Sequence, residues 1–294
     1  MITYFSKICY IFCMIDLHTH STASDGELSP SELIKYAAEK GITHLALTDH
    51  DTTDGLDEAE KAAAEEGIHF IRGIEINIER NRGEFHLLGL NLQKNSPELD
   101  QIIIQLQEAR EVRNRQIIEK MKNDGLDVSY EELKELFKVK TIGRPHFAAY
   151  LVHKKIVKHR QQAFDRYIGQ SRPYYVERKG ADLSESVDAI IKSGGIPVLA
   201  HPMSLYVSWG KLEAVLGEIK EAGVKGLEAW HPGVRKNEAI RLEEAARKLG
   251  FFVTAGSDFH GENIRADRKI GHTAGMMKID DRFWTEELLP AVNS

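Results

Sequence analysis

Short apolar runs alternate with longer amphipathic stretches along most of this 294-residue chain, and this alternation constrains the fold more than any other feature. Strand-like runs occupy residues 14–18, 44–48, 69–77, 85–90, 196–200, 226–230 and 251–256. Helical patterns lie between several of them, at residues 30–41, 54–66, 182–193, 211–222 and 236–249. The alternation predicts an α/β fold with a largely parallel sheet or barrel and right-handed crossovers.

The alternation stops between residues 93 and 180, where a long helical pattern is followed by two or three shorter ones and no strand pattern. This indicates an α-helical insertion between the fourth and fifth strands. We therefore expect a barrel formed by residues 14–92 and 181–294, an insertion at residues 93–180 and an N-terminal extension at residues 1–13. The extension is apolar but contains Lys7 and no small-residue cleavage site, so we interpret it as a loose extension or upstream start rather than a signal peptide.

Charge is distributed unevenly along the chain, whose net charge is −6. Residues 93–180 contain 18 basic and 12 acidic residues, so the insertion carries +6 and the remainder −12. From Lys138 to Lys179 there are 11 basic residues and two acidic ones. The pattern indicates a basic lid that faces an acidic barrel and suits an anionic substrate, although a solvated basic surface would look the same.

Cysteine content and hydropathy restrict the location of the protein. The two cysteines, Cys9 and Cys13, form neither a disulfide framework nor a zinc knuckle. No apolar run approaches the roughly 20 residues of a membrane span. We expect a cytoplasmic protein without membrane association and without an obligate protein partner.

Imidazole and carboxylate side chains gather where the predicted strands end. The first strand ends in His18-Thr19-His20, and alternate residues of a strand share a face, so both imidazoles can point to one metal. Asp25 follows in the next turn. The groups at the ends of the later strands are Asp49, His50, Asp51, Glu75, His86, His201, His231, Asp258 and His260. Active sites of β/α barrels assemble at the C-terminal ends of strands, and divalent cations would relieve the burial of so many ionisable groups. We expect Asp49 and Asp51 to orient His50 or neighbouring imidazoles.

The segments HTHSTASDG, LTDHDT, GIEIN, FHLLGL, LAHP and GSDFH together resemble the PHP (polymerase and histidinol phosphatase) family of metal phosphoesterases. The resemblance covers residues 14–92 and 181–260 and implies a distorted seven-stranded, TIM-like β/α barrel with three divalent metals. It implies that His18, His20, Glu75 and Asp258 hold the first metal, that Glu75, His86 and His201 hold the second, and that Asp25, His50 and His260 hold the third. Such donors suit manganese, which we expect, and also iron or zinc.

The insertion segment TIGRPHFAAYLV is similar to the branch of the family that contains nucleoside 3′,5′-bisphosphate phosphatases and 5′-to-3′ exoribonucleases. Arg144 and His146 flank Pro145, which suits the first turn of a helix, where amide groups attract phosphate. Arg144 offers a planar fork to two phosphate oxygens. Ser204 and Arg235 are weaker candidates for substrate binding. His231 matches none of the implied ligands and could protonate the leaving oxygen, bind phosphate or be structural.

The resemblance implies a metal-dependent phosphoric ester hydrolase that acts on nucleoside 3′,5′-bisphosphates or on short RNA from its 5′ end through a metal-activated hydroxide. Glu75, Asp258, His231 and Arg144 are the expected catalytic residues. Histidinol-phosphate phosphatase, or a non-catalytic metal- or nucleic-acid-binding module, are the alternatives.

Overall fold

A computed structural model of the chain describes residues 13–137, 139 and 141–293, so residues 1–12 of the expected extension lie outside the described part. The seven expected strands form one sheet in chain order. They are β1 (Met14–Thr19), β2 (Ile42–Leu47), β3 (His69–Ile78), β4 (Phe85–Leu90), β5 (Ile196–Leu199), β6 (Gly226–Trp230) and β7 (Phe252–Ala255). A bridge between Thr19 and Phe259 joins the end of β1 to the segment after β7, so the two edges of the sheet meet there. The predicted α/β class is confirmed.

Strand β4 differs from the others because it runs antiparallel to both of its neighbours, β3 and β5. The remaining pairs of neighbouring strands are parallel. Residues 79–84 alone connect β3 to β4, and so short a link can form a hairpin but not the crossover that parallel strands need. The start of β4 therefore lies at the same rim of the sheet as the ends of the parallel strands.

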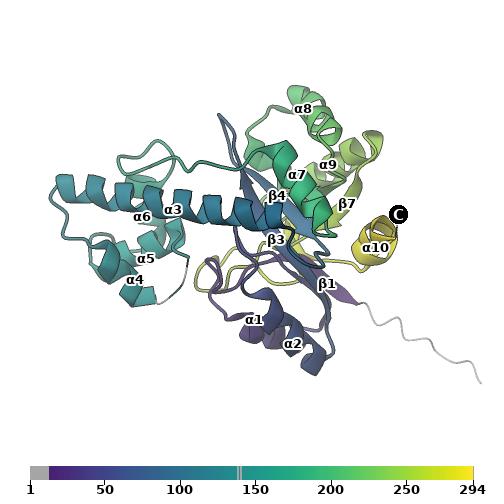
Figure 1. Cartoon of the computed structure of the whole chain (residues 1–294), viewed down its shortest axis with the longest axis horizontal. Coiled ribbons are helices and arrows are strands. Elements are labelled where there is room, and N and C mark those ends of the chain that lie inside the picture. Colours follow the sequence, from purple (N-terminus) through teal and green to yellow (C-terminus); the bar gives the residue numbers. More distant parts are fainter. Residues whose placement is uncertain (1–12, 138, 140, 294) are drawn as a thin grey trace, which may run out of the picture.

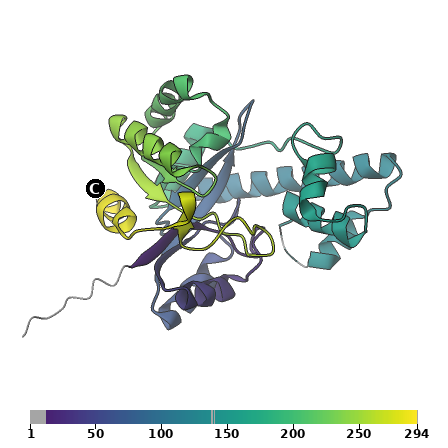
Figure 2. The ribbon, with the colours of Figure 1, turned by 180° about the vertical axis from the view of Figure 1, so that it is seen from behind.

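The helices that alternate with the strands outside the insertion pack on the outside of the sheet (Figures 1 and 2). They are α1 (Pro30–Glu39), α2 (Leu56–Glu66), α7 (Leu183–Lys192), α8 (Trp209–Glu221) and α9 (Lys236–Lys248). Helix α1 begins where the Ser29 side chain accepts a hydrogen bond from the Glu32 amide, with Pro30 in the first turn. Helix α2 ends at Gly67, whose φ of 71° is easily reached only by glycine. Local sequence signals thus set the bounds of these helices.

The C-terminal segment adds elements that the strand and helix patterns did not predict. A short hairpin pairs β8 (His272–Thr273) with β9 (Met277–Lys278). A π-helical turn, Phe283–Leu288, leads into α10 (Leu289–Val292). Phe283, Trp284 and Leu288 pack into the barrel core, which places the C-terminus beside the barrel.

The insertion is helical and projects from one side of the barrel (Figure 1). It contains α3 (Pro97–Asn123), α4 (Tyr130–Phe137), α5 (Arg144–His153), α6 (Arg160–Ala163) and a π-helical turn, Phe164–Ile168. Helix α3 contributes to two cores: Leu106 packs in the barrel core, whereas Met121 packs in a separate cluster with Phe147 and Tyr150. The helix therefore carries the insertion on the barrel. The division of the chain into these units stays a prediction.

Within the described residues, every helix is too short or too polar to cross a membrane.

The two cores of α3 can be tested with matched substitutions. Met121→Ala removes a fully buried side chain from the insertion core and should lower the free energy of unfolding by about 2–5 kcal/mol. Metal content should stay unchanged, because the predicted metal ligands belong to the barrel. Leu106→Ala, in the same helix, should cost a similar free energy in the barrel core. Denaturant unfolding and elemental analysis measure both quantities, and loss of metal from Met121→Ala would contradict separate cores.

Candidate metal centre

Backbone pairing continues past the strand ends and brings the predicted ligands together. The Asp258 amide donates to the His18 carbonyl and the His20 amide to the Phe259 carbonyl, both at 2.9 Å. A parallel bridge likewise sets His50 beside Glu75. The expectation that each ligand stands at the C-terminal end of its strand is wrong for Glu75 and for His86. Glu75 lies inside β3, and His86 lies near the start of β4, which reaches the same rim because β4 is antiparallel.

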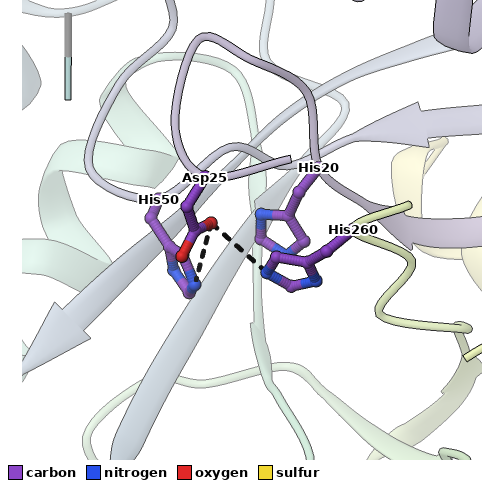
Figure 3. Close-up of side chains that lie close together, drawn as sticks. All are labelled: His20, Asp25, His50 and His260. Atoms are coloured by element: carbon purple, nitrogen blue, oxygen red, sulfur yellow. Dashed lines mark ion pairs between the residues drawn. The ribbon is translucent and has the colours of Figure 1, made fainter. Parts of the chain in front are cut away.

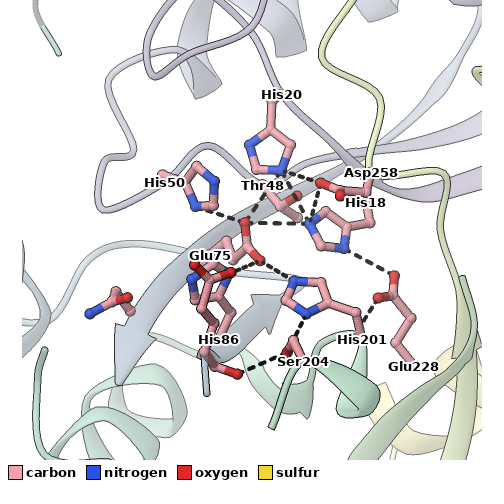
Figure 4. Close-up of polar contacts among 12 residues, drawn as sticks. His18, His20, Thr48, His50, Glu75, His86, His201, Ser204, Glu228 and Asp258 are labelled. Carbon is pink, nitrogen blue, oxygen red and sulfur yellow. Dashed lines mark hydrogen bonds and ion pairs between the residues drawn. The ribbon is translucent and has the colours of Figure 1, made fainter. Parts of the chain in front are cut away.

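Glu75 lies at the centre of the cluster, and both of its carboxylate oxygens contact imidazoles (Figure 4). Its side chain is fully buried. Oε1 lies 2.8 Å from His86 Nδ1 and 3.0 Å from His201 Nε2. Oε2 lies 2.8 Å from His50 Nδ1, 3.3 Å from His20 Nε2 and 3.4 Å from His18 Nε2. A carboxylate shared in this way has the geometry to bridge two cations.

Two further carboxylates surround this centre. Asp258 Oδ1 lies 3.4 Å from His20 Nε2 and 3.5 Å from His260 Nδ1. Asp25 Oδ1 lies 3.3 Å from His260 Nε2 and 3.9 Å from His50 Nε2, so these side chains converge from separate loops (Figure 3). Every one of the nine expected ligands belongs to a group whose donor atoms lie within 4.8 Å of one another. These ligands are His18, His20, Asp25, His50, Glu75, His86, His201, Asp258 and His260.

Hydrogen bonds on the outer ring nitrogens orient three of the imidazoles. His18 donates from Nδ1 to Glu228 Oε1 at 3.0 Å, and His260 donates from Nδ1 to the Asp258 carbonyl at 2.9 Å. Ser204 donates its hydroxyl proton to the Glu84 carbonyl, so its oxygen accepts from His201 Nδ1 at 2.9 Å. Each ring therefore keeps its Nε2 lone pair for the cluster, which is how metal-binding histidines are usually held.

The donor atoms fit divalent metal ions. Among the described residues, several buried polar atoms in the cluster make no hydrogen bond: His20 Nδ1, Asp25 Oδ1, His50 Nδ1 and Glu75 Oε2. Buried polar atoms without partners are costly, and a cation satisfies carboxylate oxygens and neutral imidazole nitrogens together. A set of imidazole and carboxylate donors without thiolates suits divalent transition metals.

The pKa shifts of the clustered side chains also show that neighbouring positive charge stabilises the buried carboxylates. Burial would raise the pKa of Glu75, but His50, His86 and His18 outweigh it and hold that pKa well below its usual value. Burial would lower the pKa of His18, whereas the charges of Glu228 and Glu75 raise it well above the usual value. Burial, with His260 and His50 beside it, lowers the pKa of His20 to about 3. Protons and metal ions thus compete for the same carboxylate-rich space.

Glu228, on β6, is a residue of the site that the sequence analysis missed. Its side chain is 1% exposed, and its Oε2 accepts from the His201 amide at 2.9 Å while Oε1 accepts from His18. It thereby fixes two ligands from different strands. A single carboxylate between Leu227 and Ala229 in an apolar strand was the signal available in the sequence.

Asp49 and Asp51 do not orient imidazoles as expected. Asp49 accepts hydrogen bonds from the Ser21 amide, the Ser21 hydroxyl and the Ser24 hydroxyl, and so fixes the loop that leads to Asp25. Asp51 accepts from Arg110 and Arg178 of the insertion. Within the described residues, neither carboxylate hydrogen-bonds an imidazole, because both are taken up by these other donors.

A cavity of about 1140 Å³ lies between the predicted metal ligands and the insertion. Arg144, Ser204 and His231 line it. His146 and Arg235 are not among the described residues that do so. His146 is buried, where its Nδ1 accepts from the Gly143 amide and caps α5, and Arg235 stands before α9 with its amide bound to Glu238. These contacts explain both positions, and we assign neither residue to substrate binding.

The two expected catalytic residues outside the ligand set have partners within the cavity. Arg144 donates from Nη2 to Glu84 Oε1 at 2.6 Å, and its side chain is 30% exposed, which leaves part of the guanidinium accessible. His231 accepts from the Gly233 amide at Nδ1, so its Nε2 carries the proton and lies 3.3 Å from Asp258 Oδ2. Arg144 therefore faces the cavity from the insertion, and His231 faces it from the barrel.

Glu228→Gln tests the orienting role of this carboxylate. The amide keeps one oxygen acceptor where the carboxylate offers two, so either His18 or the His201 segment loses its partner. We expect metal affinity to fall about tenfold to a hundredfold, as for other residues that orient metal ligands. Metal titration of the full-length protein measures it, with Glu244→Gln, exposed on α9, as the matched control. Unchanged affinity in Glu228→Gln would contradict this role.

Comparison with known proteins agrees with the geometry. The PHP domain family matches residues 16–179. A 5′-3′ exoribonuclease of Haemophilus influenzae is 37% identical over 83% of this chain and 89% of its own length. A 3′,5′-nucleoside bisphosphate phosphatase of Chromobacterium violaceum is 33% identical over 92% of this chain and 95% of its own length.

A solved structure extends the likeness to three dimensions. It is a Chromobacterium violaceum protein described as an amidohydrolase, with bound sulfate and no metal. It is 32% identical, has a TM-score of 0.83, and the alignment covers 95% of this chain and 97% of that one. The chain belongs to the PHP domain family and is a metal-dependent phosphoesterase, that is, a phosphoric ester hydrolase, as its strand-end histidines and carboxylates predicted.

Proposed function

We propose that this phosphoesterase hydrolyses nucleotides that carry a second, terminal phosphate: nucleoside 3′,5′-bisphosphates, or short RNA taken from its 5′ end. The observation that carries the proposal is a group of four arginines, two of them buried, on the insertion side of the cavity, opposite the proposed metal ligands. They are Arg110, Arg113, Arg144 and Arg178, and all of them line the cavity.

The arginine group has more positive charge than its carboxylate partners neutralise. Arg110 and Arg178 share one oxygen of Asp51, at 2.7 and 2.6 Å, and Arg144 pairs with Glu84. The hydrogen bonds found for Arg113 within the described residues go to the neutral side chain of Asn114, at 2.8 and 3.2 Å.

Burial and the neighbouring arginines lower the pKa of Arg113 well below its usual value, which reflects an unbalanced buried charge. A phosphate placed there would supply the missing negative charge and accept several charge-assisted hydrogen bonds. Because Arg110 and Arg113 are buried, the locus suits the end of a molecule rather than a phosphate within a long chain.

The insertion is held against the metal centre by close packing at its α5 helix. A Cβ atom added to Gly143 would lie 3.1 Å from an Asp25 oxygen, so glycine permits this approach. Arg144 follows directly at the start of α5. The spacing between the metal-binding residues and the arginines is therefore fixed, which favours substrates with two phosphates at a defined separation.

Three divalent ions are the metal content we propose, with manganese as the first choice and iron or zinc as alternatives. His18, His20, Glu75 and Asp258 would hold one, Glu75, His86 and His201 a second, and Asp25, His50 and His260 a third. The donor atoms of His18, His20 and Asp258 lie close together, as do those of Asp25, His50 and His260 with His20. Glu75 Oε1 lies 2.8 Å from His86 Nδ1 and 3.0 Å from His201 Nε2, which supports the second site. When bound, such ions supply hydroxide near neutral pH and neutralise phosphoryl oxygens.

The protein's own residues would bind and position the substrate. The arginines of the insertion would anchor the terminal phosphate, and His231, with its proton on Nε2, would stand beside the scissile group next to Asp258. A cavity of about 1140 Å³ is larger than the roughly 300–1,000 Å³ typical of small-molecule sites, which supports room for more than one nucleotide. The relative from Haemophilus influenzae is named a 5′-3′ exoribonuclease, and the one from Chromobacterium violaceum a 3′,5′-nucleoside bisphosphate phosphatase. Their names thus include both an RNA and a mononucleotide as substrate.

Glu75→Gln tests the bridging carboxylate. The substitution removes a negative charge that two ions would share, so two metals per chain should be lost together, whereas His50→Ala should lose one. Elemental analysis after saturation with Mn²⁺ measures the content. Glu66→Gln, exposed at the end of α2, is the control. Retention of full metal content by Glu75→Gln would rule out the bridge, and a wild type that never exceeds two metals would rule out the third site.

Arg113→Gln tests the second phosphate. It should reduce kcat/KM for a nucleoside 3′,5′-bisphosphate by about tenfold to a hundredfold and leave a simple phosphomonoester nearly unaffected. The melting temperature should not fall, because the change removes an unbalanced buried charge. Arg115→Gln, on the same helix with a side chain 58% exposed, is the matched control. Equal loss on both substrates, or a preference of the wild type for histidinol phosphate, would contradict the proposal.

A further inference from the structure

We propose that Arg268, with Arg265 beside it, binds the non-bridging oxygens of the phosphoryl group that is hydrolysed. Both residues belong to the segment after β7, at residues 261–271, to which the motifs assigned no role. The inference rests on the phosphoesterase reaction and does not depend on the nucleotide proposed above.

The segment forms one wall of the cavity next to the metal centre. Asn263, Arg265 and Arg268 are among its lining residues. Two hydrogen bonds of the Asn263 backbone anchor the wall. The Asn263 amide donates to Glu27 Oε2 at 3.1 Å, and the Asn263 carbonyl accepts from Arg160 of the insertion at 2.9 Å. A turn closed by the Arg268 amide and the Arg265 carbonyl, 2.9 Å apart, brings the two arginines together. The backbone that carries the two arginines is thus held in place before any substrate binds.

Asp258 separates the metal-binding donors from this pair of arginines. Its Oδ1 faces the imidazoles of His18, His20 and His260, at 3.4–3.7 Å. Its Oδ2 faces three other groups: His231 Nε2 at 3.3 Å, Arg265 Nη1 at 4.0 Å and Arg268 Nε at 4.0 Å. A phosphoryl group held at the metal centre next to Asp258 would therefore have two guanidinium groups at its side.

Arg268 has an unused donor at this position. Its side chain is 7% exposed, and its Nε is buried without a hydrogen-bond partner among the residues that the structure describes. The carboxylates nearest to Nε, Asp267 at 3.4 Å and Asp258 at 4.0 Å, do not form hydrogen bonds with it. An always-charged buried group with a free N–H is costly unless a ligand supplies the acceptor.

A phosphoryl group meets that need. Its three non-bridging oxygens carry the charge that is redistributed during hydrolysis, and a planar guanidinium can donate to two of them. The arginines of the insertion would bind a different phosphate, so the two arginine groups have separate effects. Loss of Arg268 should slow hydrolysis of every phosphate ester, because the group that it binds is present in all of them.

The test compares Arg268→Gln with Lys269→Gln, which removes one positive charge from an exposed position of the same segment. Calorimetry measures the affinity of the full-length, metal-loaded protein for inorganic phosphate, and elemental analysis measures its metal content. Arg268→Gln should weaken phosphate binding by about tenfold to a hundredfold and lower kcat similarly for a bisphosphate and a monophosphate. Metal content should stay unchanged, and Lys269→Gln should match the wild type in all three measurements.

Two results would overturn the inference. Unchanged phosphate affinity in Arg268→Gln would show that the guanidinium does not contact the phosphoryl group. A parallel loss of metal would show that it only neutralises Asp258. Should Arg268→Gln fail to fold, Arg265→Gln and Arg268→Lys are the variants to use, and wild-type phosphate affinity in both would overturn it equally. If Arg268→Gln weakens phosphate binding while the enzyme shows no preference for bisphosphates, the nucleotide proposal fails and this inference stands.

Discussion

The burial of the Glu75 carboxylate is the constraint on which the rest of the site depends. Imidazoles from the ends of several strands surround both of its oxygens at 2.8–3.4 Å. A carboxylate at such a depth costs several kcal/mol unless cations compensate it, and the imidazoles provide that compensation either as protonated groups or as metal ligands. Glu228 and Asp258 contact several of these rings and hold them in place. The curvature of the sheet and the positions of its loops bring the rings together around this one buried carboxylate.

One strand end connects the metal centre to the insertion. His50 and Asp51 are neighbours after β2, where Asp51 has a φ of 53° and the chain turns. His50 turns toward Glu75, whereas Asp51 turns toward Arg110 and Arg178. The barrel and the insertion are thereby joined through buried charges on either side of the cavity. The substrate proposed above, with negative charge at both ends, would complement that arrangement.

Backbone strain marks the same strand ends. Asp51, His201 and Asp258 have φ values of 53°, 26° and 52°, which non-glycine residues seldom adopt. Conformations of this kind cost about 1–3 kcal/mol each and persist where surrounding contacts enforce them. Here the chain leaves β2, β5 and β7, and the turn directs each side chain into the cluster or toward the insertion. Surrounding contacts therefore hold these residues in strained backbone conformations, and those conformations let the donor side chains converge.

The sequence by itself determined the seven strands, the helices between them and the set of expected ligands. Alternation of apolar residues and helix-capping signals are local properties, and the imidazoles and carboxylates follow strands that a barrel must bring to one rim. Only the tertiary structure decided that β4 runs antiparallel and that Glu228 orients His18. It also decided that Arg113 and Arg268 Nε are buried without a carboxylate hydrogen bond among the residues that the structure describes. The physical reason is that the environment of a charged side chain depends on groups that are distant in the sequence. No local sequence pattern specifies which of those groups will lie beside it.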